Sequence, residues 1–264
     1  MGKPVVKWVG GKRGILDTLV SAMPVDYGAY YEPFAGGLAL YLNLAPLVGH
    51  KAYISDLNED LINLYDVIQK QPDELMARLD EHAASHDEKY YYEVRGCHHL
   101  PMGLERAARF VFLNKTGYNG LMRYNAKGEF NTPWGHKKNP VQLYVKQDII
   151  DASYALSKAT VRCRSYSQCR PKEGDFVYLD PPYDSSFTAY NAGGFGVGGQ
   201  VKLAEWCRKL DENGVLFMLS NSNTPLIKEL YQGFNIQIVS APRAVSCKAN
   251  GRKAVDEVLV RNYA

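Results

Sequence analysis

Residues 175–183 read Asp175-Phe176-Val177-Tyr178-Leu179-Asp180-Pro181-Pro182-Tyr183. The apolar run predicts a buried strand, and two consecutive prolines cannot continue a strand ladder, so the chain must turn stiffly after it. In α/β sheets, ligands bind at the carboxyl ends of the strands. On these residues alone, a functional turn and a rigid surface turn both remain open.

The side chains of this turn would suit methylation of an exocyclic amine such as that of adenine. The lone pair of that amine is delocalised into the ring, which makes it a poor nucleophile. Two acceptors, the Asp180 carboxylate and the Pro181 carbonyl, would hold its hydrogens and favour a tetrahedral nitrogen. Pro182 has no N–H to donate, and Tyr183 offers a flat face on which a flipped base could stack. We therefore expect catalytic roles for Asp180, Pro181, Pro182 and Tyr183.

Upstream of this turn, residues 30–34 predict a first strand that breaks into a glycine turn at Gly36 and restarts as a helix at Leu38. Residues 51–55 predict the next strand, which is closed by Asp56 about 20 residues after the glycines, where an acid commonly bonds ribose hydroxyls. This order predicts a doubly wound sheet with a cofactor at a helix N-terminus. The open alternatives are a tight turn with a core Phe34, and an N-cap role for Asp56.

A shaped loop is also predicted near the N-terminus, around Gly10 and Gly11. Trp8 could lie over the cationic end of a cofactor, and Lys12 could meet its carboxylate. A solvated basic N-terminus with one core Trp is the alternative.

Between residues 60 and 111 the apolar periodicity is helical and too long for one crossover helix, which predicts an inserted helical domain. A polar, aromatic stretch with glycines follows, at residues 114–138. After the catalytic turn we expect a glycine-rich loop over residues 184–199 that closes over the base, a helix over 201–210 and a strand over 215–219. An antiparallel hairpin of 236–239 with 255–260 is predicted last, with a basic tip at 248–253.

Composition sets broad limits. The chain has 264 residues, 46% hydrophobic and 22% charged, with a formal net charge of +3, which neither demands nor excludes a polyanionic partner. The five cysteines lack metal or redox spacing, so we expect no metal site and a reducing, cytoplasmic environment. No stretch approaches the roughly 18 apolar residues of a membrane span.

These blocks, in this order, resemble the DNA adenine methylase (Dam) family of the D-P-P-Y class. The matching segments run across nearly the whole chain: residues 7–12, 32–34, 56–58, 113–114, 117–121, 123–125, 128–131, 180–183, 187–190 and 220–221. The resemblance implies an α/β fold with a Rossmann-like S-adenosylmethionine-dependent methyltransferase sheet. It also implies a catalytic domain of residues 1–58 and 145–264, with a mainly helical target-recognition domain inserted at 59–144. One departure is that the second glycine of the family's loop is replaced here by Leu38.

The resemblance also implies site residues. S-adenosyl-L-methionine, which leaves as S-adenosyl-L-homocysteine, would contact Trp8, Gly11, Lys12, Phe34, Gly36, Asp56, Tyr166 and Asp180. Double-stranded DNA, with GATC as target, would contact Lys7, Asn114, Tyr118, Asn119, Leu121, Arg123, Asn131, Pro133, Lys137 and Lys138. The interleaving of aromatic and basic side chains favours a nucleic-acid surface over a merely solvated charged face. We expect a monomer with no obligatory protein partner.

Other functions are weaker interpretations. A cytosine C5 methyltransferase needs a cysteine nucleophile after a proline, and no cysteine here follows one. Protein glutamine methyltransferases carry Asn where Asp180 stands and lack the insertion. An RNA target is harder to exclude, because the amine chemistry is the same. A non-catalytic DNA-binding module is disfavoured by the intact Asp180 motif.

Overall fold

The computed structural model describes residues 2–44, 49–183, 195–241 and 255–264. In these residues, seven strands form one sheet in the order β3-β2-β1-β4-β5-β7-β6. The strands are β1 Tyr30–Glu32, β2 Ala52–Asp56, β3 Ala159–Cys163, β4 Phe176–Leu179, β5 Leu216–Ser222, β6 Asn235–Ala241 and β7 Val255–Arg261. β1 runs parallel to β2 and β4, β4 runs parallel to β5, and β7 is antiparallel to both of its neighbours. The predicted Rossmann-like α/β sheet is thus confirmed.

The described chain divides into two compact units, each taken here by itself. The first comprises Met1–Gly11, Gly36–Val48 and Asp56–Cys163, and the second comprises Lys12–Ala35, Gly49–Ser55 and Arg164–Ala264. The division into a catalytic domain and a target-recognition domain stays a prediction, because two compact units do not show which function each unit has.

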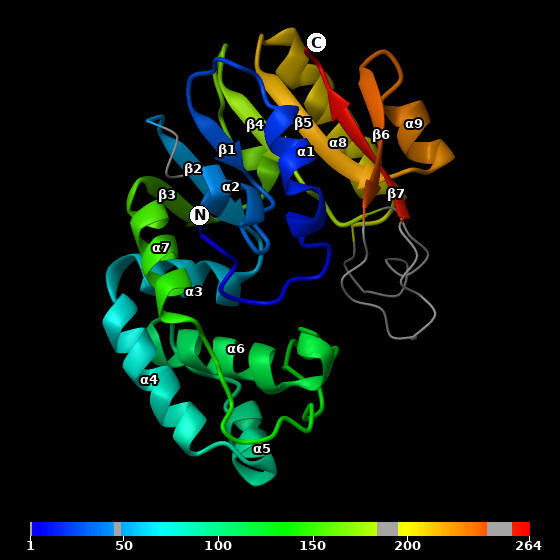
Figure 1. Cartoon of the computed structure of the whole chain (residues 1–264). Helices are drawn as coiled ribbons and strands as arrows, with labels where there is room; N and C mark the ends of the chain where they lie inside the picture. The colour runs from blue at the N-terminus through cyan, green and yellow to red at the C-terminus, as the bar shows by residue number, and fades with distance from the viewer. Residues whose placement is uncertain (1, 45–48, 184–194, 242–254) are drawn as a thin grey trace. The chain divides into compact units, whose positions relative to one another are not determined.

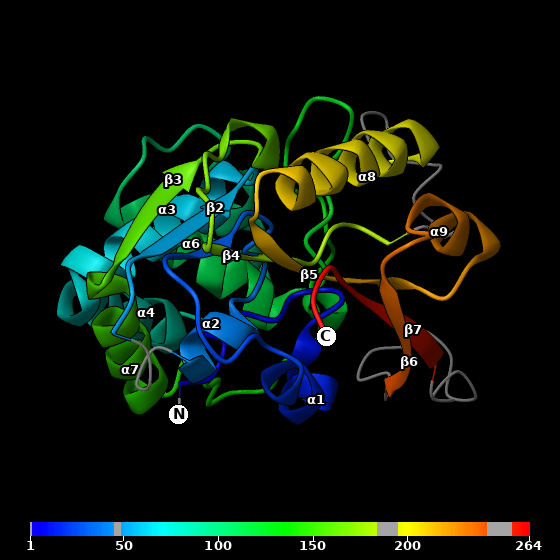
Figure 2. The same cartoon turned by 90° about the horizontal axis from the view of Figure 1, so that it is seen from above.

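The second unit is built on β1, nearly all of β2, and β4, β5, β6 and β7. Alternate residues of β4 and β5, such as Val177 and Phe217, pack against Leu203 and Cys207 of helix α8, Val197–Glu212. Helix α9, Pro225–Leu230, adds Ile227 to the same core. Figure 2 shows α8 on one side of β4 and β5, and α1, Leu16–Ser21, on the other. Burial on both faces explains why β4 is apolar throughout.

The first unit is mainly helical, as expected for the insertion. Figure 1 shows α6 with α3, α4 and α5 around it. Residues 110–113 of α6 are all buried, which makes it the central helix of this unit. Asn58 caps α3 by accepting a 2.9 Å hydrogen bond from the Leu61 amide. The helices are α2 Ala39–Leu44, α3 Glu59–Lys70, α4 Pro72–Ala84, α5 Glu88–Gly96, α6 Leu104–Thr116 and α7 Lys146–Ser157.

Two elements, α7 and β3, were not predicted from the sequence, and a third, α8, begins earlier than predicted. α7 buries small alanines beside Ile149 and Leu156, which weakens its apolar periodicity. β3 buries only Val161, so it lacks a strand pattern. α8 begins at Val197, so Gly198 and Gly199 lie in its first turn and not in the predicted loop. The helix forms despite these glycines because its apolar face is buried against the sheet.

Residues 184–194 of the predicted closing loop and the basic hairpin tip, 248–253, lie outside the described residues. Among the helices of the described chain, none combines the length and the apolar character that crossing a membrane requires.

Candidate active site

The turn that follows β4 carries an ion pair. Nζ of Lys12 lies 2.8 Å from Oδ1 of Asp180, and the two side chains are 5% and 21% exposed. Lys12 opens the short helix η1, Lys12–Ile15. The same ammonium lies 4.6 Å from the ring centroid of Tyr183, a cation–π distance. The structure thus brings together three predicted site residues from two distant parts of the sequence.

Burial sets the protonation of Asp180. It raises the pKa of this carboxyl to about 6, with Lys12 acting to lower the pKa and Glu257 to raise it. A carboxylate with a pKa near 6 is ionised at neutral pH and is more basic than an exposed aspartate. It can therefore accept hydrogen bonds from a neutral amine and can also take up a proton that such an amine loses.

Tyr183 is anchored from β7. Its hydroxyl donates a 2.6 Å hydrogen bond to Oε2 of Glu257. Burial, with the nearby carboxylates of Asp180 and Glu257, raises the pKa of Tyr183 well above its usual value, so the phenol stays protonated. Nothing in the sequence points to Glu257, which lies in an ordinary strand pattern.

The carbonyl of Pro182 also has a partner that sequence reasoning missed. Gln200 of α8 donates from Nε2 to this oxygen across 2.8 Å. No local sequence signal pairs a helix glutamine with this turn, because the contact depends on how α8 packs on the sheet.

A group of aromatic rings surrounds Phe34 in the second unit. The Phe34 ring stacks on Tyr166 with centroids 5.4 Å apart, so these two predicted cofactor residues are neighbours. Phe195 meets Phe34 edge-on at 5.7 Å, and Trp206 meets Tyr166 at 5.3 Å. Phe195 and Trp206 were not predicted, and an apolar group of aromatic rings of this kind suits a purine ring.

In the first unit, both backbone groups of Gly36 form hydrogen bonds with side chains. Its amide donates to Oδ2 of Asp56 across 3.0 Å, and its carbonyl accepts from the Tyr65 hydroxyl. Its φ is +45°, and a Cβ added there would lie 2.8 Å from Cδ1 of Trp8. Only glycine fits this place. Gly11 closes the neighbouring loop by donating from its amide to the Trp8 carbonyl across 3.3 Å.

Asp56 combines burial with spare acceptor capacity. Oδ1 accepts from the Asn58 amide at 2.9 Å, and Oδ2 accepts from Gly36. Burial raises the pKa of this carboxyl, while the amide hydrogen bonds from Asn58 and Gly36 act against that shift. Each oxygen has a second lone pair, so a diol could still be bound.

The departure at Leu38 has a structural counterpart. Its φ is 57°, in the left-handed region where glycine is at ease. That backbone costs about 1–2 kcal/mol for a residue with a side chain. The Leu38 side chain is fully buried, and such burial contributes roughly 1.5–3 kcal/mol. Burial thus offsets the strain, and the turn forms without the second glycine.

The predicted recognition segment is an irregular hairpin in the first unit. Isolated β-bridges pair Gly117 with Trp134 and Tyr124 with Phe130. Beside the first bridge, the short helix η2, Tyr118–Gly120, contains Asn119 with φ 53° and Gly120 with φ 67°. Tyr118 is 48% exposed beside the exposed Asn119, so η2 presents an aromatic and an amide side chain to solvent.

Asn114 joins this hairpin to the N-terminal segment. Its Oδ1 accepts from the Lys7 amide, and its Nδ2 donates to the Lys7 carbonyl, each at 2.8 Å. The same Nδ2 lies 3.4 Å from the Gly120 carbonyl. Asn114 is fully buried. The prediction of a direct DNA contact by Asn114 is therefore revised: it fixes Lys7 beside the hairpin.

Other predicted DNA residues lie on the surface of this unit. Arg123 is exposed, and its guanidinium donates from Nε to Oδ1 of Asn131 at 2.8 Å. Leu121 and Asn131 are half-buried, and the exposed members of the set are Lys7, Tyr118, Asn119, Arg123, Pro133, Lys137 and Lys138. The pKa of Lys7 is lowered by burial and by the nearby charge of Lys137, which marks a local excess of positive charge.

Two arginines of α6 make contacts within the first unit. Arg106 forms an ion pair with Asp60 at 2.5 Å. Arg109 donates to the carbonyls of Val94 and Arg95 at 2.9 and 2.7 Å. Both guanidinium groups thus stabilise the fold of this unit.

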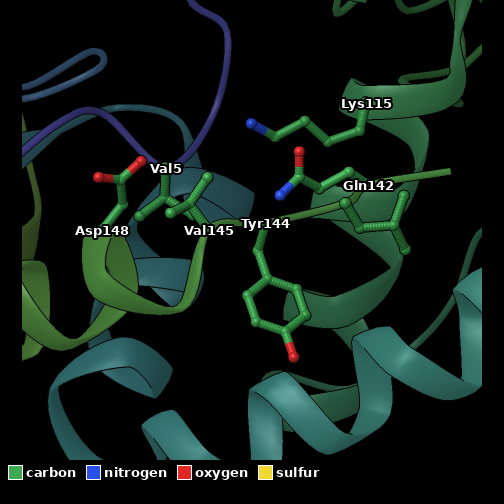
Figure 3. A pocket seen from close by; sticks show the side chains of 7 residues that line it. Val5, Lys115, Gln142, Tyr144, Val145 and Asp148 are labelled. Carbon is green, nitrogen blue, oxygen red and sulfur yellow. The ribbon is translucent and has the colours of Figure 1, made fainter.

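A small cavity of about 110 Å³ also lies in the first unit. Figure 3 shows the side chains of Lys115 and Gln142 on one side of it and Asp148 on the other. None of the predicted site residues lines it, so it is separate from the features above.

Comparison with known proteins identifies the family. The model of the D12 class N6 adenine-specific DNA methyltransferases matches residues 8–245. The type II methyltransferase M1.LlaDCHI of Lactococcus lactis subsp. cremoris is 38% identical over 99% of this chain and 95% of its own. The type II methyltransferase M.MjaIII of Methanocaldococcus jannaschii is 39% identical over 99% of each chain. The DNA adenine methylase of Escherichia coli K12 is 34% identical over 96% of this chain and 93% of its own. The chain therefore belongs to the D12 class N6 adenine-specific DNA methyltransferase family and is an adenine-specific DNA methyltransferase.

Proposed function

We propose that this enzyme transfers a methyl group from S-adenosyl-L-methionine to the N6 amine of an adenine flipped out of double-stranded DNA, within the sequence GATC. The observation that carries the chemical part is the Asp180 carboxylate, which follows β4 and is held 2.8 Å from the Lys12 ammonium. This arrangement supplies a fixed, ionised acceptor beside a turn whose prolines donate no hydrogen bond.

In this mechanism Asp180 and the Pro181 carbonyl accept the two amine hydrogens of adenine. Lys12 keeps Asp180 ionised and restrains its rotation. Once methylated, the nitrogen carries a positive charge and must lose a proton, and Asp180 is the nearest base for it. Its pKa of about 6 lets it take that proton and release it to water at neutral pH.

Tyr183 provides the stacking face in this proposal. Its hydroxyl is tied to Glu257 and one ring face lies against Lys12, so the ring is held before the base arrives. Stacking of a flipped base on an aromatic ring is worth about 1–3 kcal/mol.

The residues predicted for the cofactor fit its chemistry. Asp56 keeps free acceptor lone pairs for a ribose diol. The glycine at position 36 leaves room beside Trp8 that a Cβ would fill. The stacked rings of Phe34 and Tyr166 would offer apolar contacts to the adenine ring, and Trp8 and Gly11 would complete the contacts. When bound, S-adenosyl-L-methionine supplies an electrophilic methyl group on a sulfonium, a reaction that needs no metal.

The GATC assignment rests on the resemblance of the hairpin and is supported by its geometry. Lys7 is fixed beside Gly120 through Asn114, so a donor for the first guanine would lie next to η2 and its exposed Tyr118 and Asn119. Exposed Tyr118 would wedge into the base stack and Asn119 would hold the orphaned thymine. Arg123 has the forked donors that read guanine O6 and N7.

The remaining contacts are assigned by chemistry. Leu121 and Pro133 would touch the thymine methyl, Asn131 would orient Arg123, and Lys137 and Lys138 would meet phosphates. We propose that the enzyme acts as a monomer.

The test is methyl transfer from labelled cofactor to unmethylated duplex DNA, followed by mapping of the modified adenines. Methylation confined to GATC supports the whole proposal, whereas methylation of adenines in another sequence rejects the target and keeps the chemistry. A duplex RNA of the same sequence serves as the second substrate. Equal or faster methylation of that RNA would reject DNA as the preferred polymer.

A further inference from the structure

The carbonyl of Pro182 is held by a side chain from a different element. Gln200 lies in the first turn of α8 and is fully buried, and its Nε2 donates to this oxygen across 2.8 Å. Its Oε1 accepts from Nδ2 of Asn221 at 3.0 Å. Asn221 lies in β5 and is also fully buried.

The direction of these hydrogen bonds is set by the backbone. The Ser222 amide can only donate, and it donates to Oδ1 of Asn221 at 2.8 Å. Asn221 must therefore turn its Nδ2 toward Gln200, and Gln200 must turn its Oε1 toward Asn221. A donor is thus left facing Pro182. The strand amide dictates the orientation of a side chain two hydrogen bonds away.

The catalytic turn has an unusual need for such a contact. The rings of Pro181 and Pro182 fix φ near −65°, and neither residue has an N–H with which to anchor the turn. The remaining freedom lies in the two ψ angles, which set where the carbonyls point. The Gln200 bond restrains ψ of Pro182, while Lys12 holds Asp180 on one side and Glu257 holds Tyr183 on the other.

We propose that Gln200, oriented by Asn221, is a positioning residue for methyl transfer: by holding the Pro182 carbonyl it fixes the end of the turn, so that the adenine amine meets Asp180 and the Pro181 carbonyl together. This inference rests on the proposed role of the turn in holding the amine. Gln200 does not touch the base. Its effect is on the rate of the chemical step, since misplacement of reacting groups by about 1 Å can cost on the order of 100-fold.

The experiment compares Gln200→Met with a matched control, Gln69→Met. Gln69 uses the same chemistry, donating from Nε2 to the carbonyls of Leu156 and Ala159, but it belongs to the first unit and has no hydrogen bond to the turn among the described residues. We expect Gln200→Met to lower the single-turnover methylation rate about 10- to 100-fold with nearly unchanged Kd for DNA and for S-adenosylmethionine. Gln69→Met should lower the melting temperature similarly and keep the rate. Equal losses in both variants, or a Gln200→Met rate within about twofold of wild type, would overturn the proposal.

Gln200→Glu gives a readout that a merely structural role would not move. A protonated glutamic acid can donate to the Pro182 carbonyl, but an ionised one cannot. The rate of this variant relative to wild type should rise as pH falls, and a ratio that does not change with pH contradicts the donor role. This comparison decides the matter if Gln200→Met does not fold.

Two further variants separate this inference from the proposed function. Asn221→Asp loses the donor that orients Gln200 and should reproduce the rate loss of Gln200→Met. Asp180→Ala tests the turn itself. If Asp180→Ala is inactive and Gln200→Met is normal, only the positioning role fails; if Asp180→Ala keeps its turnover, the proposed function of the turn fails.

Discussion

The hydroxyl of Tyr183 donates to the carboxylate of Glu257 across 2.6 Å, which places a negative charge of β7 beside the catalytic turn. That charge raises the pKa of Asp180, whose value of about 6 comes first from burial. Because the ionised carboxylate is the form that accepts from the amine, kcat/KM should fall as pH falls through about 6.

Glu257→Gln keeps an acceptor for Tyr183 and removes the charge. The pKa of Asp180 should drop, so the acid limb of the kcat/KM profile should move to lower pH. Glu229→Gln, an exposed carboxylate on α9, is the control and should leave the limb in place. If the kcat/KM profile of Glu257→Gln coincides with that of wild type, the acid limb does not report the ionisation of Asp180.

Asp180→Ala removes the acceptor aimed at the reacting amine. Loss of one such preorganised group typically lowers turnover on the order of 100-fold or more. DNA affinity should change less, because phosphate contacts dominate it. Single-turnover rates and filter binding on the same duplex measure the two effects, and Asp180→Asn, which keeps one oxygen acceptor, should be impaired less than Asp180→Ala.

Gly36→Ala places a methyl group 2.8 Å from Cδ1 of Trp8 in a backbone with φ +45°. Trp8 or the loop must move, and we expect cofactor affinity to fall at least about 10-fold, since binding sites depend on such close placement. Gly96→Ala is the matched control, because an added Cβ there meets nothing within 4 Å. Titration calorimetry with S-adenosylmethionine measures the change. Unaltered affinity in Gly36→Ala would remove this loop from the cofactor site.

Arg123→Ala should relax specificity at one base pair. Loss of a bidentate guanine contact costs about 1–3 kcal/mol on the cognate site and less on sites already altered at that position. Turnover on GATC and on singly substituted sites reports the difference. Lys138→Ala is the comparison, expected to weaken all sequences alike and to reduce the salt dependence of binding. If Arg123→Ala also lowers all sites equally, Arg123 meets a phosphate.

The sheet and the catalytic turn were predictable because their signals are local. An apolar run into two prolines marks the end of β4, and the hairpin of β6 and β7 was predicted from its apolar pattern. Leu38 was recognisable as a departure from the family's glycine, and the structure places it at φ 57°. In such cases one or a few residues along the chain determine the conformation.

The partners of the turn were not predictable, because each depends on packing between distant segments. Glu257 and Gln200 sit in ordinary strand and helix patterns, and only the pairing of β5 with β7 and the docking of α8 bring them to Tyr183 and Pro182. Asn114 was predicted to touch DNA because it is polar and lies beside the hairpin. Its burial could be read only from the folded unit.

The contact of Asn114 with Lys7 and Gly120 has a consequence for attempts to exchange target specificity between relatives. Grafting residues 117–134 alone would transfer the hairpin, whereas the neighbouring segment around residue 7 would still come from the recipient enzyme. Because one buried amide joins the two, the transferable unit is discontinuous in sequence: the hairpin, residue 114 and the segment around residue 7. Chimaeras that move all three should methylate the target sequence of the donor enzyme, whereas chimaeras that move only the hairpin should discriminate less well between target sequences.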